Sequence, residues 1–402
     1  MTTDELIVAN PDSLQRMKWE EEIEQTSIGD LLCYGTADMD FRCPEPILSA
    51  LSGVLQAGHL GYPRVTDTFY RAVEDWLYRR TGWKPDARTS VLQNLGIYLS
   101  AWNVLDAETR PGDRITILTP VHFCFKRIIQ ANGRTAIECP LSYENGAYSI
   151  PYSYLESCFA SGSRVLWFCN PHNPIGKAWT REELSRVAEL CEKYHVLIVS
   201  DDVYCGLIDP DAVYTPIASL SKQISQQTVT LYSISKTYNT TGLRHSFVVT
   251  ENPALLKDYM ESMQKMDLEY GLNIMGMAAT ITAFNECDGW VKNLMLRMRE
   301  YRAMLKECLA AEAPNVRVAD SDAGYFAWID LRALGIPGRQ LKHRILQEAH
   351  ILVENGAELG KGGEGFVRFN LACSEEHMKE GMMRLAAFCK TYTKKSFRGR
   401  GK

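Results

Sequence analysis

The chain has 402 residues, of which 46% are hydrophobic and 23% are charged, and its formal net charge is −5. This length and apolar content allow a large buried core and more than one domain, whereas the mildly acidic balance argues against a nucleic-acid partner. The sequence has no apolar stretch typical of a signal peptide or a membrane span. The 12 cysteines lack zinc-ligand spacing, so we expect no metal site and reduced thiols in a reducing compartment, the cytoplasm.

The first part of the chain predicts a domain of alternating strands and helices. A polar N-terminal segment ends in a loop broken by prolines, and a helical pattern begins at Ile47. A helix over 180–194 is expected to begin after Thr180, with Glu183 completing a capping box. Strands that alternate with helices predict an α/β fold with a mainly parallel sheet. The short apolar runs that predict its buried strands are 114–120, 164–170, 195–202 and 227–235.

The pattern changes near residue 285. A long amphipathic helix is predicted over 289–313, and three apolar runs after it predict strands that alternate with helices. These features indicate a second, smaller α+β domain. We therefore expect four parts of the chain. Residues 1–48 form an N-terminal segment that joins the small domain, and residues 49–285 form the large domain. Residues 286–390 form the small domain, and residues 391–402 form a disordered basic tail.

Polar side chains follow three of the predicted strands, where ligands gather in open α/β sheets. Asn170 and Asn173 follow the second strand, Asp201 ends the third, and Ser233 and Lys236 follow the fourth. An amine, a carboxylate and an amide suit a phosphorylated pyridine aldehyde: the amine forms a Schiff base, and the carboxylate holds a proton on the ring nitrogen. Each motif alone is typical of a turn or a helix cap, but their ordered combination is specific.

In this order and spacing, the motifs resemble those of fold-type I pyridoxal 5′-phosphate (PLP) enzymes of the class I/II aminotransferase superfamily. Within it, the chain resembles the MalY/PatB type of cystathionine β-lyase, or C–S lyase. The resemblance implies a large domain with a mainly parallel, seven-stranded type of sheet and a smaller α+β C-terminal domain. It rests on ADMDF at 37–41, GYPR at 61–64, NPHNPIGKAWTREEL at 170–184, AWIDLR at 327–332 and GFVRFNLACS at 365–374.

The resemblance also implies roles for matching residues. Lys236, Asp201 and Tyr204 are expected to be catalytic: Lys236 carries PLP, and Asp201 pairs with the ring nitrogen. Asn173, helped by Tyr204, is expected to bond to the phenolate oxygen of the cofactor. Arg368 is expected to bind the α-carboxylate of the substrate, where its planar guanidinium gives a bidentate fit.

The phosphate of the cofactor is expected to bind at the start of a helix, where backbone N–H groups favour an anion. Tyr62 is implied to reach the phosphate and the substrate from a neighbouring subunit, so the resemblance predicts a homodimer. The residues implied in binding the phosphate end of the cofactor are Gly96, Ile97, Ser233, Ser235, Arg244 and Tyr62.

Two residues depart from the family pattern, and a glycine-rich segment resembles a nucleotide-binding loop. His122 replaces the aromatic residue, usually Tyr, that stacks over the pyridine ring, and it is interpreted as a neutral stacking ring, although an imidazole can also titrate. Leu95 replaces a polar residue of the phosphate turn. The glycine-rich 360–365 segment precedes a strand, so it fails the context of a nucleotide-binding loop and is interpreted as a mobile loop near the substrate mouth.

The predicted reaction is α,β-elimination from a cysteine S-conjugate or a cystathionine-like thioether, with release of a thiol, pyruvate and ammonia. No second arginine matches a known clamp for a dicarboxylate side chain, so aspartate or glutamate is expected to be a poor substrate. Three alternatives stay open: an aminotransferase, a tailoring enzyme of secondary metabolism that eliminates or oxidatively decarboxylates an S-cysteinyl intermediate, and a regulatory protein that keeps the fold. The first of these needs the same lysine, aspartate and arginine.

Overall fold

The computed structural model describes residues 5–8, 16–269 and 272–399. The expectations for residues 1–4 and 9–15 of the N-terminal segment, and for 400–402 of the basic tail, therefore lie outside the described residues.

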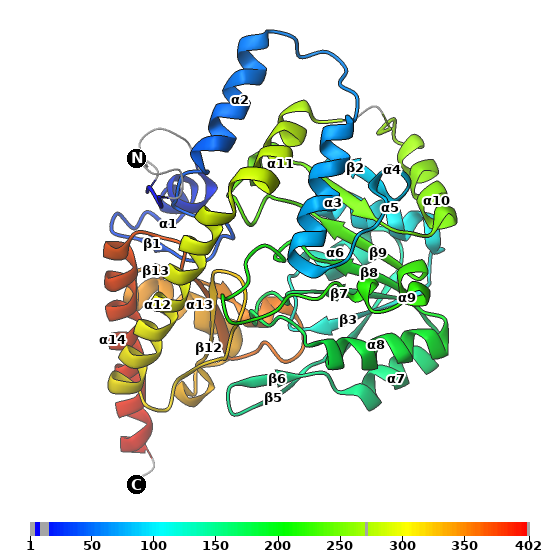
Figure 1. The fold of residues 1–402 in the computed structure, drawn as a ribbon. Coiled ribbons are helices and arrows are strands. Elements are labelled where there is room, and N and C mark those ends of the chain that lie inside the picture. The colour runs from blue at the N-terminus through cyan, green and yellow to red at the C-terminus, as the bar shows by residue number, and fades with distance from the viewer. Residues whose placement is uncertain (1–4, 9–15, 270–271, 400–402) are drawn as a thin grey trace.

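A seven-stranded sheet forms the centre of the large domain (Figure 1). β10 runs antiparallel to both of its neighbours, and all other adjacent pairs are parallel. The prediction of a mainly parallel sheet is thus confirmed, and β3, β7, β8 and β9 are the four strands expected from the sequence. In spatial order the strands are β2 (Val91–Asn94), β10 (Ser246–Val249), β9 (Thr228–Tyr232), β8 (Leu197–Asp201), β7 (Ser163–Cys169), β3 (Arg114–Thr119) and β4 (Thr135–Pro140).

Alternating side chains along β7 explain why this sheet is covered on both faces. Val165 and Trp167 belong to one buried cluster together with residues of α5 and α6, whereas Leu166 and Phe168 belong to another with residues of α7 and α8. Because successive side chains of a strand point to opposite faces, a continuous apolar run needs a cover on each side. These helices are α5 (Ile97–Glu108), α6 (Cys124–Ala131), α7 (Tyr152–Ala160) and α8 (Arg181–Tyr194).

α8 begins with the capping box that the sequence predicted. The Thr180 side chain accepts from the backbone N–H of Glu183, and the Glu183 carboxylate accepts from the backbone N–H of Thr180. The other elements of the large domain are α2 (Glu45–Ala57), α3 (Asp67–Thr81), α4 (Ala87–Ser90), α9 (Lys222–Gln226), α10 (Pro253–Gln264), α11 (Ile274–Glu286), and the hairpin of β5 (Ser142–Glu144) and β6 (Ala147–Ser149). α2 begins two residues before Ile47, because Pro46 is tolerated in the first turn of a helix.

The small domain packs helices against a four-stranded antiparallel sheet (Figure 1). The run 350–356 forms two short strands rather than one: β13 pairs in parallel with β1 of the N-terminal segment, and β14 pairs with β15. The strands are β11 (Arg317–Val318), β12 (Phe326–Asp330), β15 (Phe366–Asn370), β14 (Glu354–Asn355), β1 (Leu32–Cys33) and β13 (Ile351–Leu352), and the helices are α1 (Glu22–Thr26), α12 (Asp288–Glu312), α13 (Gly338–Ala349) and α14 (Glu375–Gly399).

α12 confirms the long amphipathic helix expected over 289–313. α14 continues as a helix to Gly399, past residue 391, where we expected a disordered tail to begin. Single helical turns complete the fold: a π-helical turn at Met17–Glu21 and 3₁₀ turns at Ile217–Ser219, Thr241–Leu243, Arg332–Leu334 and Gly356–Leu359.

The cysteine side chains are thiols, and all of them are buried except Cys43 and Cys308, which are partly exposed. In the described ranges, none of the helices combines the length and the apolar character needed to cross a bilayer. The same residues contain no group of three or more His, Cys, Asp or Glu side chains placed to hold a metal ion.

Candidate active site

The predicted polar residues meet where β7, β8 and β9 end, because these three strands are parallel neighbours in the sheet. A cavity of about 90 Å³ lies at this edge, and α5 begins at its wall. Seven predicted residues line it: Gly96, Ile97, Asp201, Ser233, Ser235, Lys236 and Arg244. Parallel packing thus brings together residues that are far apart in the sequence.

The amine of Lys236 is held by the N-terminal segment. Its Nζ donates a hydrogen bond to the carbonyl oxygen of Ala37 at 2.8 Å, and Tyr325 Oη donates to the same oxygen at 3.0 Å. Burial, together with the positive charge of Arg368, lowers the pKa of Lys236 to about 8. Because an ordinary lysine has a pKa near 10.4, a far larger fraction of Lys236 is the neutral, nucleophilic amine near neutral pH.

Asp201 is a carboxyl group buried at the end of β8, with 3% of its surface exposed. Burial raises its pKa to about 7, and the opposing effects of the Val203 backbone N–H and the Lys236 charge do not offset it. A cationic partner in the cavity would favour the ionised carboxylate.

The start of α5 and Arg244 form the end of the cavity that suits an anion. Gly96 precedes the helix with a φ of 110°, which favours glycine, and a Cβ added there would lie 3.8 Å from the Arg244 guanidinium. The hydroxyl of Ser233 donates to the carbonyl of His245 and accepts from the backbone N–H of Ser235. A helix start beside a guanidinium is well suited to a phosphate group.

Arg368 lies on β15 with only 1% of its surface exposed. Its Nη1 donates to Asn173 Oδ1 at 3.0 Å, and its Nη2 donates to the carbonyl of Gly35 at 2.7 Å and lies 3.4 Å from Glu354 Oε2. Its Nε is buried and has no hydrogen-bond partner among the described residues. This arrangement joins two predicted residues, Arg368 and Asn173, directly.

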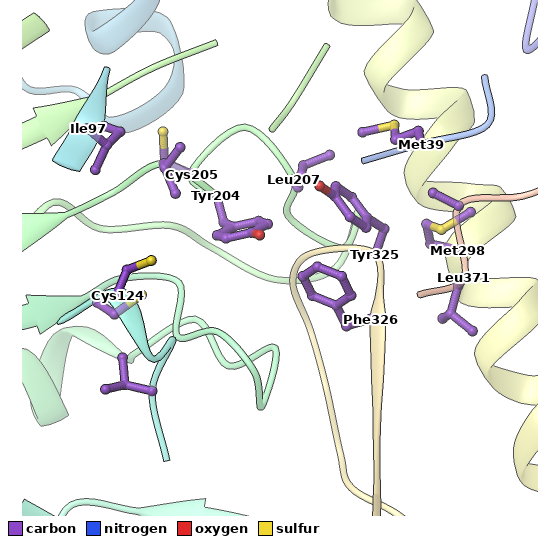
Figure 2. Packing of buried hydrophobic residues seen from close by; sticks show 14 of the residues in the cluster. Met39, Ile97, Cys124, Tyr204, Cys205, Leu207, Met298, Tyr325, Phe326 and Leu371 are labelled. Atoms are coloured by element: carbon purple, nitrogen blue, oxygen red, sulfur yellow. The ribbon is translucent and has the colours of Figure 1, made fainter. Parts of the chain in front are cut away.

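Tyr204 contacts the small domain from the large one. Figure 2 shows its ring facing Tyr325 and Phe326, and the ring centroids lie 6.0 Å and 5.9 Å from that of Tyr204. The Tyr204 hydroxyl is buried and finds no hydrogen-bond partner in the described part of the chain. Such a group is costly unless a ligand bonds to it.

His122 follows β3 and is bonded to a residue that the sequence analysis did not single out. Tyr98, in the first turn of α5, has its Oη 2.9 Å from His122 Nδ1, and the two rings stack with an interplanar angle of 15°. Burial, and then the charges of Arg368, Lys236 and Arg127, hold the pKa of His122 well below its usual value. These effects favour the neutral form of the ring, and its stacking over the pyridine ring of a cofactor stays a prediction.

Tyr62 is not among the residues that line this cavity. It lies between α2 and α3 and is 91% exposed. The segment 360–365 packs beside the end of β3: a Cβ added to Gly360 would lie 2.9 Å from the Thr119 side chain, and the backbone N–H of Lys361 donates to Glu138.

The sequence analysis missed Tyr98, Ala37, Thr241 and His245, of which all but Ala37 line the cavity. Tyr98 follows the recognised Gly96–Ile97 turn directly, so its position was the available signal. Ala37 takes part through its backbone carbonyl, which side-chain chemistry does not reveal.

Comparison with known proteins identifies the family. The sequence profile of the family "Aminotransferase class I and II" matches residues 56–385, most of the chain. This chain belongs to that family. Within it, the chain is 33% identical over 374 residues to cystathionine beta-lyase PatB of Bacillus subtilis (strain 168), covering 93% of this chain and 96% of the relative.

Two further members support the same placement. Protein MalY of Escherichia coli (strain K12) is 25% identical, over 91% of this chain and 93% of the relative. The crystal structure of cystalysin from Treponema denticola, described as containing pyridoxal 5′-phosphate, superposes with a TM-score of 0.92 at 27% identity, over 97% of this chain and all of that one. This class I and II family member therefore has the fold of a fold-type I PLP enzyme, as the resemblance implied.

The polar groups of the site fit PLP. A protonated ring nitrogen would place a further cation beside buried Asp201, and the unpaired Tyr204 hydroxyl could bond to a phenolate oxygen. The α5 start with Arg244 suits the phosphate, and Lys236 supplies the amine.

Proposed function

We propose that this protein is a PLP-dependent C–S lyase, which eliminates a thiol from a cysteine S-conjugate or a cystathionine-like thioether. The observation that carries this proposal is the likeness to cystathionine beta-lyase PatB, which extends over 96% of that relative and includes the segments around Lys236 and Arg368. The family also contains aminotransferases, so amino transfer is the alternative that the experiment below must separate.

Arg368 is proposed to bind the α-carboxylate of the substrate. Its buried Nε lacks a hydrogen-bond partner in the described residues, and its Nη1 is bonded to an amide rather than to a carboxylate. A substrate carboxylate can therefore gain a charge-assisted bond at Nε. Asn173 accepts the Arg368 bond through Oδ1, so its Nδ2–H is proposed to donate to the cofactor.

Lys236 is proposed to take the proton from the α-carbon. With a pKa of about 8, a useful share of its amine is neutral near neutral pH. PLP held by these residues would supply the electron sink for the pair of the broken Cα–H bond. Asp201 holds the proton on the ring nitrogen, and Tyr204 donates a hydrogen bond from its otherwise unpaired hydroxyl.

The electron pair then breaks the Cβ–S bond, and the thiolate leaves. A thiol with a pKa of about 8.5 departs readily as an anion, so a strong acid is not needed. The released enamine takes up water and yields pyruvate and ammonia. The protein thus moves one proton at Lys236 and leaves the redox state of the substrate unchanged overall.

A homodimer in a reducing compartment, the cytoplasm, is part of this proposal. Tyr62 is 91% exposed in the protomer, and the apolar side chains of Leu55 and Leu60 in the same region are 58% and 61% exposed. The α2 region that holds them projects from the top of the molecule (Figure 1). Such a surface supports contact with a second copy, and the thiol state of the cysteines supports a reducing environment.

The test is a product assay on S-substituted cysteines. The holoenzyme is incubated with S-methyl-, S-benzyl- and cystathionine-type substrates, with and without pyruvate or 2-oxoglutarate, and pyruvate and free thiol are measured. We expect equal amounts of thiol and pyruvate that do not depend on the added oxo acid, and none from Lys236→Ala protein. Amino transfer without thiol release from any thioether would assign the aminotransferase activity instead.

A further inference from the structure

A second cavity, of about 300 Å³, lies beside the active site. The end of β3, the start of α6 and the turn before β15 form its walls, and His122, Phe123, Arg127 and Leu359 are among its lining residues. His122 connects the two cavities, since its Nδ1 is bonded to Tyr98, and Tyr98 lines the cofactor cavity together with Lys236. The side chains of His122 and Tyr98 thus lie between the second cavity and the cavity that holds Lys236.

The position of the cavity suits the part of the substrate that leaves. Arg368 is proposed to hold the α-carboxylate and Lys236 to face the α-hydrogen, so the side chain of the substrate must extend toward a third region. His122 lines the second cavity and is bonded to Tyr98 in the wall of the cavity that holds Lys236. With a volume of about 300 Å³, the second cavity is a space beside this centre that can take a bulky group.

Phe123 and Arg127 give this cavity a chemical preference. The Phe123 ring lines the cavity and is 38% exposed, so it offers an apolar surface to a ligand. The Arg127 guanidinium lies over that ring, 5.4 Å from its centroid. Its Nη2 donates to Cys124 Sγ at 3.1 Å, and no carboxylate of the described residues lies within 4.0 Å of it.

Lys126, next to Arg127 in the sequence, differs from it because it is already paired with a carboxylate. Lys126 also lines the cavity, but its Nζ lies 2.8 Å from Glu138 Oε1, so its charge is neutralised. Glu358 is the other acidic residue of the lining and is exposed. Arg127 is therefore the cation of this cavity that can still pair with an anion on a ligand.

We propose that the second cavity binds the S-substituent of the substrate and favours an aromatic or apolar group that carries a carboxylate. The apolar body would stack on Phe123, and the carboxylate would pair with Arg127. This inference rests on the proposed C–S lyase function and extends it to the class of thiol that leaves. No motif of the sequence predicts this second basic residue.

The test compares three substrates and matched variants of the holoenzyme. S-(4-carboxybenzyl)-L-cysteine, S-benzyl-L-cysteine and S-methyl-L-cysteine differ in the carboxylate and in the aromatic body. Arg127→Gln should raise KM for the carboxybenzyl substrate about threefold to tenfold more than for the benzyl substrate, as for a partly exposed ion pair. Phe123→Ala should raise KM for both benzyl substrates relative to the methyl one. Lys193→Gln, which removes an exposed lysine paired with Glu156 outside the cavity, is the control and should leave the ratio unchanged.

A binding measurement separates affinity from turnover. Calorimetry on Lys236→Ala protein loaded with PLP measures the dissociation constants of the carboxybenzyl and benzyl substrates. Their ratio should change with Arg127→Gln as the ratio of KM values does, and high salt should reduce the preference for the carboxylated substrate. An unchanged carboxybenzyl-to-benzyl ratio in Arg127→Gln, or an equal shift in Lys193→Gln, would overturn the inference. Glu358→Gln should not weaken binding of the carboxylated substrate, and a weakening would also contradict it. If wild-type protein releases no thiol from any of the three, the proposed function itself fails.

Discussion

Two groups of opposite charge, the half-buried Lys236 and the buried Asp201, define the centre at the scale of single residues. The pKa of Lys236 is lowered to about 8 and that of Asp201 is raised to about 7, each chiefly because burial disfavours the charged form. Both shifts bring the groups close to neutral pH, where an amine can accept a proton and a carboxyl can respond to a bound cation.

Asp201 predicts a pH dependence of the stability of the cofactor-free protein. A raised carboxyl pKa means that the folded state keeps its proton while the unfolded chain ionises, so this contribution falls as pH rises from about 4 to about 7. Urea unfolding measures how far the free energy of unfolding falls between pH 5 and pH 7.5. This fall should be about 2 to 3 kcal/mol smaller in Asp201→Asn than in wild type. Equal decreases in the two proteins would mean that Asp201 is ionised at pH 5 in the folded state.

At the scale of elements, the stretch of chain over 35–41 joins the two halves of the site. Its carbonyls accept hydrogen bonds from Arg368, Lys236, Asn370 and Asn239. Asn239 also accepts from the Met39 backbone N–H at 3.0 Å. Through these bonds one loop contacts both the strand that carries Arg368 and the turn that carries Lys236.

Asn239 offers a test of this connection. It is held at a φ of 55°, a conformation that alanine disfavours and glycine adopts freely. Asn239→Gly should lower the free energy of unfolding by about 1 to 3 kcal/mol through lost hydrogen bonds, and Asn239→Ala by about 1 kcal/mol more through backbone strain. Both variants should also lower kcat, measured with the thioether assay, because Lys236 and Arg368 lose their common support. Wild-type stability in both variants would show that the loop does not depend on Asn239.

At the scale of the whole molecule, the proposed dimer makes each site depend on two chains. If Tyr62 completes the neighbour's site, Tyr62→Ala and Lys236→Ala proteins should each be nearly inactive, because every site in each lacks one residue. Mixed dimers contain one intact site, so refolding an equal mixture should restore about a quarter of the wild-type sites. Sedimentation of the wild-type protein should give a dimer at assay concentration.

Two results would contradict the proposed role of Tyr62 in the site of a neighbouring subunit. A monomer with full activity, or a mixture no more active than its two components, would show that Tyr62 does not act across a subunit boundary. Mixing Lys236→Ala with Asp201→Asn protein is a suitable control, because both residues belong to the same protomer's site and no mixed dimer regains an intact one.

Much of the fold and of the cofactor cavity could be predicted from residue order alone. The strands β3, β7, β8 and β9 are continuous apolar runs, and α8 carries its capping box in the sequence, so both follow from local rules. Because parallel strands end at one edge of a sheet, the residues after them had to meet, and Asp201, Ser233 and Lys236 do line one cavity.

Other features depend on contacts between segments that no local pattern relates. The bond from Tyr98 to His122, the support of Lys236 by the Ala37 carbonyl, and the division of 350–356 into β13 and β14 all require the partner segment to be in position. Arg127 and Lys126 are adjacent cations in the sequence, and only folding pairs one with Glu138 and leaves the other facing a cavity. Nearly every residue has the same backbone donor and acceptor, so the sequence does not show which carbonyl will support Lys236. The pairing of charges depends on the distance between them, so only the packed chain decides which cation meets a carboxylate.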